Sequence, residues 1–288
     1  MSTNTARTTK SRPRRPQMVM EVVAVEELSP TFKRITFGGA DFDLFQDSAA
    51  VDKYVKLLLP RDPSSGLTPP FDMDELRNPL ANDELPLRRT YTVHSVDPAS
   101  KTLKMDFVIH GADGLAGPWA EHAKVGDLLQ FSGPGGKYQP DPEADWHLLA
   151  GDEAAIPAIG AVLAAMPTDA VGHALIEVAT PDDEWRLSAP EGVDITWLHR
   201  GGAFTPQTTL LEQAVKNLPW REGRVQAFIH GERESMKVLR QYLHDERGID
   251  RADLSLSAYW AYGREEDTFQ AEKSLPVGQI YPEADLQY

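Results

Sequence analysis

The stretch that decides the fold spans residues 87–96 and reads LRRTYTVHSV. Threonine, tyrosine and valine favour extended backbone, so this run predicts a β-strand. Side chains of a strand alternate between its two faces. Arg89 and Tyr91 therefore project to one face of the predicted strand, and Thr92 projects to the other.

A cation, a flat ring and a hydroxyl set out in this way are what a flavin requires. Arg89 could pair with a pyrophosphate through its planar guanidinium, and Tyr91 could stack on an isoalloxazine ring. Thr92 could hydrogen-bond near the flavin N5. The same residues could equally form an ordinary strand with a half-buried tyrosine, so the motif gains meaning only from its surroundings.

The first half of the chain has the pattern of an all-β domain. Runs rich in Val, Ile, Phe, Tyr and Thr are separated by turn residues such as Gly, Pro and Asp. The predicted strands span residues 19–28, 31–37, 54–59, 88–96, 102–110 and 127–132. They predict an antiparallel barrel or sandwich, with one short helix over 116–123 and a long connection over 61–86.

The pattern changes near Trp146, where strands begin to alternate with helices. Strands are predicted over 146–150, 173–179, 195–199, 225–230 and 254–259, with helices ending near 165 and spanning 208–217 and 232–246. This alternation is typical of a doubly wound, mostly parallel sheet. We expect domains over 18–140 and 146–265, a basic N-terminal tail over 1–17 and a C-terminal tail over 266–288.

Composition limits the chemistry. The 288 residues include no cysteine, which excludes disulfides, a cysteine nucleophile and thiolate metal sites. Any redox chemistry must therefore use a bound organic cofactor or a non-thiolate metal. We expect no metal site and no catalytic triad.

Charge and hydropathy limit the partners. The net charge of −15 argues against nucleic-acid binding. No apolar run approaches the roughly 18 residues of a membrane span, and the N-terminus has no apolar signal core, so we expect a soluble, unexported protein. We further expect it to be cytoplasmic and monomeric. The cations of the first seventeen residues are either an arm for an anionic partner or a solvated tail, and composition favours the tail.

A glycine-containing turn follows the fifth predicted strand. Gly114, Ala116 and Gly117 are small, and Pro118 suits the first turn of a helix. Small residues let backbone approach a ligand, and free N–H groups at a helix start bind anions, so this turn could seat a pyrophosphate. The glycines could also simply make the turn. Trp119 is more typical of packing than of catalysis.

Three strand ends of the second domain could bind a dinucleotide, because open α/β sheets bind ligands at the carboxyl ends of their strands. A Gly-x-Gly-x-x-Gly fingerprint is absent, and each position also has a plain structural interpretation as a packed or helix-starting residue. The candidates are Gly151, Asp152 and Glu153 after the first strand, His199 and Arg200 after the third, and Gly231 and Glu232 after the fourth.

Aromatic residues follow the last predicted strand in Tyr259-Trp260-Ala261-Tyr262. They could close over a flat cofactor or substrate. They could equally close the end of the core, and the sequence favours neither interpretation.

Taken in order, these motifs resemble the siderophore-interacting protein family of FAD-dependent ferric-siderophore reductases, within the ferredoxin reductase-like superfamily. The resemblance runs from about Met18 to Arg264. It rests on the motifs above together with 106–111, DFVIHG, and 149–153, LAGDE. It implies an N-terminal antiparallel six-stranded β-barrel for the flavin and a C-terminal doubly wound α/β domain for NADPH or NADH.

The resemblance also implies roles for single residues. The FAD site would comprise Arg89, Tyr91, Thr92, His110, Gly114, Ala116, Gly117 and Trp119. Trp260 would lie near the flavin, and Lys56 and Arg264 would hold the ferric siderophore. Relatives often carry arginine directly after Tyr-Trp, where this chain has Ala261.

The implied reaction passes hydride from NAD(P)H to FAD and single electrons from FAD to ferric iron, which releases iron from the siderophore. Two alternatives remain: a general flavin or ferredoxin-type NAD(P)H reductase, and a non-catalytic siderophore-binding protein. A ferredoxin partner is acidic, and the acidity of this chain argues mildly against it.

Overall fold

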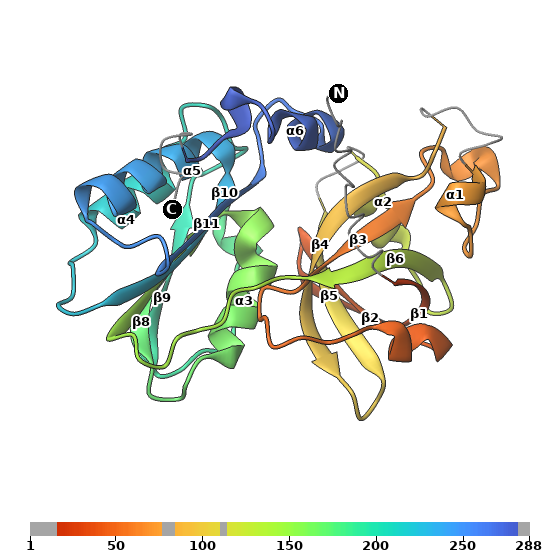
Figure 1. The fold of residues 1–288 in the computed structure, drawn as a ribbon, viewed down its shortest axis with the longest axis horizontal. Coiled ribbons are helices and arrows are strands. Elements are labelled where there is room, and N and C mark those ends of the chain that lie inside the picture. The colour runs from red at the N-terminus through yellow and green to blue at the C-terminus, as the bar shows by residue number, and fades with distance from the viewer. Residues whose placement is uncertain (1–15, 77–83, 110–113, 282–288) are drawn as a thin grey trace, which may run out of the picture.

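The computed structural model describes residues 16–76, 84–109 and 114–281. They form a barrel followed by an α/β sheet, which lie side by side in Figure 1. The predicted fold class, an antiparallel six-stranded barrel followed by a doubly wound parallel sheet, is confirmed.

The barrel closes because its first and last strands pair. Its order is β1-β2-β5-β4-β3-β6, and β6 pairs antiparallel with β1. The short α2 packs against β2 and β5. The bounds are β1 Gln17–Ser29, β2 Phe32–Gly38, β3 Tyr54–Leu59, α1 Met73–Leu76, β4 Leu87–Asp97, β5 Thr102–Val108, α2 Ala116–His122 and β6 Leu128–Gly135.

The second domain is a five-stranded parallel sheet in the order β11-β10-β7-β8-β9. The order reverses at β7, which puts the topological switch point between β7 and β10. The bounds are β7 Trp146–Gly151, α3 Ile156–Ala165, β8 Val171–Val178, β9 Gly192–His199, α4 Leu210–Asn217, β10 Val225–Glu232, α5 Arg233–Arg240 with a π-helical turn Gln241–Glu246, β11 Leu254–Trp260 and α6 Glu266–Glu272.

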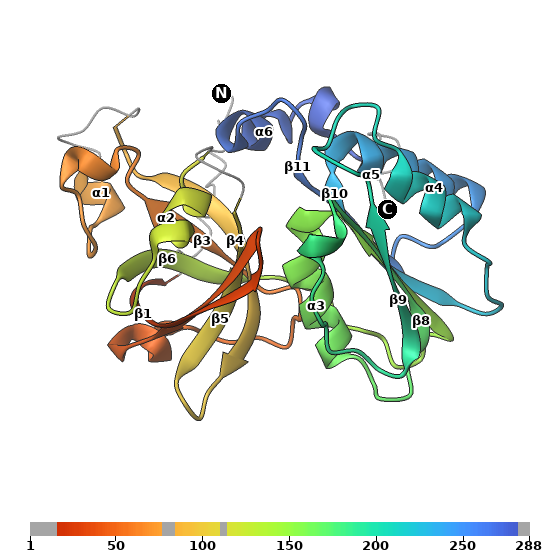
Figure 2. The ribbon, with the colours of Figure 1, turned by 180° about the vertical axis from the view of Figure 1, so that it is seen from behind.

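Helices cover both faces of this sheet (Figures 1 and 2). α3 lies between the sheet and the barrel, and α4 and α5 lie on the far side. The side chains of β7 explain the arrangement, because Leu149 packs in the cluster of α3 while Leu148 and Ala150 pack in the cluster of α4 and α5. A strand apolar on both faces is what a buried parallel sheet needs.

Two segments contain more structure than the sequence indicated. The connection over 61–86 includes α1 in its described part, and Phe71 and Met73 pack there against Leu58. The expected C-terminal tail includes α6, whose Phe269 is fully buried. The basic segment 1–15 lies outside the described residues.

Candidate functional site

The barrel strand β4 places Arg89 and Tyr91 on one face, as predicted. Their cross-strand partners on β3, Leu57 and Val55, are buried in the barrel core. The Tyr91 ring stacks on Phe107, with ring centroids 4.6 Å apart and planes inclined by 28°. Burial raises the pKa of the Tyr91 phenol well above its ordinary value, so the hydroxyl keeps its proton at neutral pH.

Arg89 connects the barrel to the end of the chain. Its Nη1 donates to the Arg88 carbonyl at 2.9 Å and to Asp267 of α6 at 3.1 Å. Among the described residues both contacts of the guanidinium use Nη1, so its other nitrogens can face an anionic ligand. Thr92 lies on the opposite face of β4, across from Tyr54.

The glycine-containing turn lies where the strand-to-helix connection was expected. Gly114 has φ of +81°, which glycine adopts without strain. Gly117 packs so closely on β5 that an added Cβ would lie 3.2 Å from the Val108 carbonyl. Ala116 is buried beside it, and His110 lies outside the described residues.

Trp119 is a packing residue in this structure. Its ring lies 6.2 Å from Phe37 and 5.8 Å from Phe107. It therefore supports the same aromatic core on which Tyr91 stacks.

At the carboxyl edge of the sheet, the buried Asp152 carboxylate joins three strand ends. Its Oδ2 accepts from the Glu232 backbone N–H and from the Trp260 indole, both at 2.8 Å. Its Oδ1 accepts from the Ala154 N–H at 3.0 Å. Burial, assisted by the charge of Glu153, raises the pKa of Asp152 to about 7 although the three donors oppose the rise.

The neighbouring candidates have clear packing roles. A Cβ on Gly151 would lie 2.5 Å from both Ala155 and the His230 carbonyl, so only glycine fits there. Gly231 has φ of +156° and packs against Asp152. Glu232 caps α5, accepting from the Glu234 and Ser235 N–H groups, and it also accepts from the Tyr262 N–H at 3.0 Å.

Arg200 is held by carboxylates. Its Nη2 pairs with Glu153 at 2.5 Å and its Nη1 lies 3.5 Å from Glu177, which is buried. The preceding residue has its own partner, because His199 Nε2 lies 2.6 Å from Glu184. The structure therefore brings the predicted residues Glu153 and Arg200 together and directs His199 to a third carboxylate.

The aromatic residues after β11 gather with a residue that the sequence did not single out. The ring of Phe204, in the loop after β9, lies 5.0 Å from Trp260 and 6.1 Å from Tyr262. This loop is distant from Trp260 in the sequence, and only the parallel sheet brings the two strand ends to one edge.

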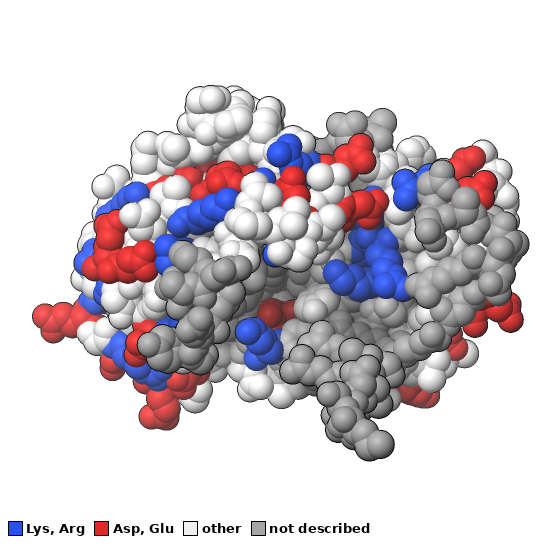
Figure 3. Space-filling view, turned by 45° about the horizontal axis from the view of Figure 1, so that its top comes forward, with Lys and Arg blue, Asp and Glu red and all other residues white. Residues whose placement is uncertain are grey.

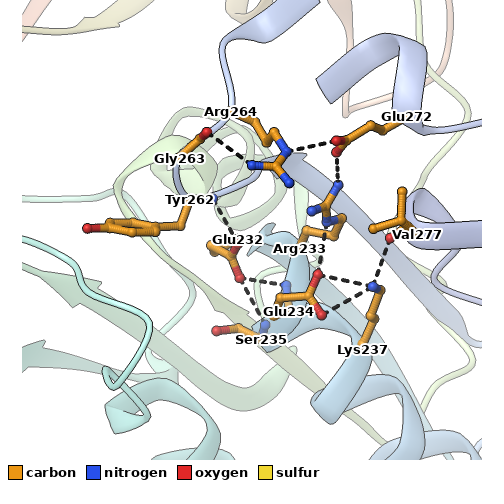
Figure 4. Close-up of polar contacts among 10 residues, drawn as sticks. All are labelled: Glu232, Arg233, Glu234, Ser235, Lys237, Tyr262, Gly263, Arg264, Glu272 and Val277. Carbon is orange, nitrogen blue, oxygen red and sulfur yellow. Dashed lines mark hydrogen bonds and ion pairs between the residues drawn. The ribbon is translucent and has the colours of Figure 1, made fainter. Parts of the chain in front are cut away.

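The two predicted siderophore-binding cations have different surroundings. Arg264 donates through Nε to Glu272 at 2.7 Å, and Arg233 binds the same carboxylate (Figure 4). Lys56, on β3, donates to Thr90 and lies 5.6 Å from the centre of the Tyr54 ring.

Sequence reasoning missed Lys273, which follows α6 and lies 4.4 Å from the Phe269 ring. Desolvation lowers the pKa of Lys273; Glu266 opposes this, and the charge of Lys56 lowers it further. Glu266 and Lys56 therefore both lie within electrostatic range of the Lys273 ammonium. Figure 3 shows basic side chains on both sides of a hollow in the face of the molecule that is turned toward the viewer.

The chain belongs to the siderophore-interacting protein family. Residues 21–138 match the siderophore-interacting FAD-binding domain, and residues 144–263 match the siderophore-interacting protein domain. An uncharacterized protein of Mycobacterium tuberculosis is 45% identical over 90% of this chain and 95% of its own length. Ferric vibriobactin reductase ViuB of Vibrio cholerae is 33% identical over 91% of this chain and 96% of its own.

Solved structures agree with this assignment. A siderophore utilization protein from T. fusca superposes with a TM-score of 0.76 at 34% identity, over 87% of this chain and 94% of its own. The ferredoxin reductase in carbazole 1,9a-dioxygenase has a TM-score of 0.60 at 15% identity, over 85% of this chain and 68% of its own, and so shares the fold.

None of the helices among the described residues is both long and apolar enough to span a membrane. The same residues contain no group of three or more His, Cys, Asp or Glu side chains arranged to hold a metal ion.

The raised pKa of Asp152 predicts a pH-dependent stability. At pH values between the ordinary pKa of an aspartate and about 7, Asp152 is protonated in the folded protein and ionised in the unfolded chain. The free energy of unfolding therefore falls as the pH rises through this range. Wild-type protein should therefore lose about 1–3 kcal/mol of unfolding free energy between pH 5 and pH 8 through this carboxyl. Asp152→Asn should not show that loss, as measured by urea unfolding at both pH values.

The variant should also be less stable at pH 5 by about 1–3 kcal/mol, because donors reach both oxygens of the protonated carboxyl group, whereas the amide NH₂ of asparagine cannot accept a hydrogen bond. Asp169→Asn, at an exposed position, is the matched control and should follow the wild-type pH dependence. Equal pH dependence in Asp152→Asn and wild type would contradict a raised pKa at this carboxyl.

Proposed function

We propose that this protein is an FAD-containing, NAD(P)H-dependent ferric-siderophore reductase that releases ferrous iron in the cytoplasm. The observation that carries the proposal is the adjacency of two candidate sites. On the barrel, Arg89 hydrogen-bonds Asp267 of α6, the helix that follows β11. At the end of β11, Trp260 hydrogen-bonds Asp152 at the carboxyl edge of the sheet. The similarity to ferric vibriobactin reductase supports the reaction class.

The described residues of the barrel suit FAD. The Arg89 guanidinium would pair with the pyrophosphate through nitrogens other than Nη1, and the N–H groups of Ala116 and Gly117, at the start of α2, would add donors. The Tyr91 ring, fixed by Phe107, would offer a flat surface to the flavin ring. FAD, when bound, would supply the capacity to take up a hydride and give out single electrons.

The carboxyl edge of the sheet would bind the reduced nicotinamide nucleotide. The crevice between β7 and β10 is the expected place for a dinucleotide. Asp152 keeps that edge fixed by holding Glu232 and Trp260. Arg200 would meet a nucleotide phosphate only by giving up part of its pairing with Glu153 and Glu177.

We propose that Lys56 and Lys273 together attract the ferric siderophore. The charge of Lys56 reaches the Lys273 ammonium, so an anion that lies near both would be attracted by two positive charges, against the opposing charge of Glu266. Arg264, the other candidate, would first have to leave Glu272. Trivalent iron bound to catecholates carries more negative charge than iron bound to hydroxamates, so the catecholate complex should depend more strongly on these lysines.

Turnover by the FAD-loaded protein tests the proposed function. Purified protein should take up FAD and turn yellow. With NADH or NADPH it should reduce a ferric siderophore, and a ferrous-iron chelator should register the product. Free flavin and a ferredoxin serve as alternative acceptors. Failure to bind FAD would exclude the reductase, and equally fast reduction of every acceptor would favour a general flavin reductase.

Arg89→Ala should weaken FAD binding by about 10- to 100-fold, because a charge-assisted hydrogen bond contributes about 1.5–3 kcal/mol. Fluorescence titration of the apoprotein with FAD measures the dissociation constant. Arg88→Ala is the matched control, since Arg88 is an exposed arginine on the opposite face of the same strand. Equal affinities for the two variants would refute the assignment of Arg89 to the pyrophosphate.

Lys56→Ala and Lys273→Ala should each raise the KM for an anionic ferric catecholate by about 5- to 10-fold, with a smaller effect on a ferric hydroxamate. The catecholate effect should shrink as salt is added. Lys124→Ala, which removes an exposed lysine of the barrel, is the control for net charge. Wild-type KM values for both complexes in both variants would remove the lysines from the substrate site.

A further inference from the structure

One hydrogen bond joins the first turn of the barrel to the second domain. The Thr31 hydroxyl, between β1 and β2, donates to Asp183 Oδ1 at 2.6 Å. Asp183 lies in the loop after β8, is only 4% exposed, and accepts through Oδ2 from the Thr180 N–H and hydroxyl, both at 2.9 Å. These bonds hold the pKa of Asp183 below its ordinary value although burial opposes them, so the acceptor is a carboxylate at neutral pH.

An aromatic contact makes the same junction rigid. Phe32, the residue after Thr31, is fully buried and packs in the hydrophobic cluster that includes α3 of the second domain. Its ring lies 4.6 Å from Trp185, two residues beyond Asp183. A barrel residue is therefore part of the core of the second domain, and the Thr31–Asp183 bond fixes its orientation.

The junction adjoins elements of both proposed cofactor sites. On the barrel side, the Thr31 carbonyl accepts from the Ile109 N–H at 2.7 Å, directly after β5, and Gly117 of the 114–119 turn packs on the carbonyl of the neighbouring Val108. On the sheet side, Asp183 follows β8 at the carboxyl edge, where the charge of Arg200 contributes to its low pKa. The junction thus contacts the end of β5 beside the flavin turn, and it lies within electrostatic range of Arg200 at the nucleotide edge.

We propose that Thr31 and Asp183 are positioning residues that set the distance between the nicotinamide and the flavin. The inference rests on the proposed function. In the step concerned, the C4–H bond of the reduced nicotinamide breaks and its electron pair moves with the hydrogen to the flavin; the nicotinamide is oxidised and the flavin is reduced. This transfer needs the reacting atoms within roughly 3–3.5 Å, and a displacement of about 1 Å can cost 100-fold in rate.

Thr31→Val is the variant that tests the junction. Valine has nearly the shape of threonine, so it removes the interdomain hydrogen bond and leaves the Asp183–Thr180 bonds in place. Thr31→Ser restores the hydroxyl and is the conservative rescue. Thr180→Val is the matched control, because it removes a bond within the loop and keeps the one between the domains.

The first measurement reports geometry without any cofactor. Because the chain has no native cysteine, nitroxide labels can be placed at Val125→Cys on the barrel and Glu222→Cys on the second domain, both at exposed positions. Pulsed electron resonance then gives the distribution of the distance between the domains. We expect Thr31→Val to broaden or shift this distribution, and Thr31→Ser and Thr180→Val to keep the wild-type one.

The second measurement is the single-turnover rate of flavin reduction at saturating NADH or NADPH. Thr31→Val should slow it by about 10-fold, with an increased deuterium isotope effect from C4-deuterated nucleotide, while FAD affinity and reduction by dithionite stay unchanged. Thr31→Ser should remain within about twofold of wild type.

A wild-type distance distribution together with a wild-type reduction rate in Thr31→Val would overturn the inference. Wild-type protein that neither nucleotide reduces would instead contradict the proposed function, and the label distances would still show whether the bond sets the domain arrangement. The inference would also be overturned if flavin reduction were as slow in Thr180→Val as in Thr31→Val. The effect would then come from the loop that contains Asp183 and not from the hydrogen bond between the domains.

Discussion

The carboxylate of Asp152 is the constraint on which the functional end of this molecule depends. Three strand ends meet there, and the donors are a backbone N–H on β10, an indole on β11 and a backbone N–H after β7. Burying a carboxyl costs free energy, and here the three donors offset only part of the cost, because the pKa of Asp152 is still raised to about 7. The same group therefore orients Trp260, starts α5 at Glu232 and closes the corner after β7. An edge fixed in this way can present a crevice of constant shape to a ligand.

Charge balance gives the candidate sites a second common property. In a chain of net charge −15, each arginine considered for a ligand already faces a carboxylate: Arg89 faces Asp267, Arg200 faces Glu153, and Arg264 faces Glu272. A bound phosphate or siderophore would displace these carboxylates from the arginines or share the arginines with them. The free energy gained on binding is therefore smaller than it would be with unpaired arginines. Lys273 has two charged neighbours of opposite sign, because Glu266 raises its pKa while burial and the charge of Lys56 lower it.

The sequence predicted the two domains and most of their strands, because alternation and β-branched composition are local signals. It also predicted which face of β4 carries Arg89 and Tyr91. It missed α6, because Glu266–Glu272 is polar apart from Ala271 and the buried Phe269 and resembles a solvated tail. It missed Asp183, because the partner Thr31 lies 152 residues away and no local pattern marks a bond between domains. For the same reason the sequence could not indicate that Lys273 lies near Lys56.

The C-terminal helix α6 has a mechanical consequence. The chain passes from the barrel to the sheet through residues 136–145, and it returns to the barrel when Asp267 reaches Arg89. Two such ties prevent the domains from sliding apart and permit a rotation about the line through the ties. The contacts of Thr31 and Phe32 with Asp183 and Trp185 are a third tie, which resists that rotation. The domains should thus behave like a door that has two hinges and a latch. Opening for a bulky ligand would release the latch, and cutting the chain before α6 would remove one hinge.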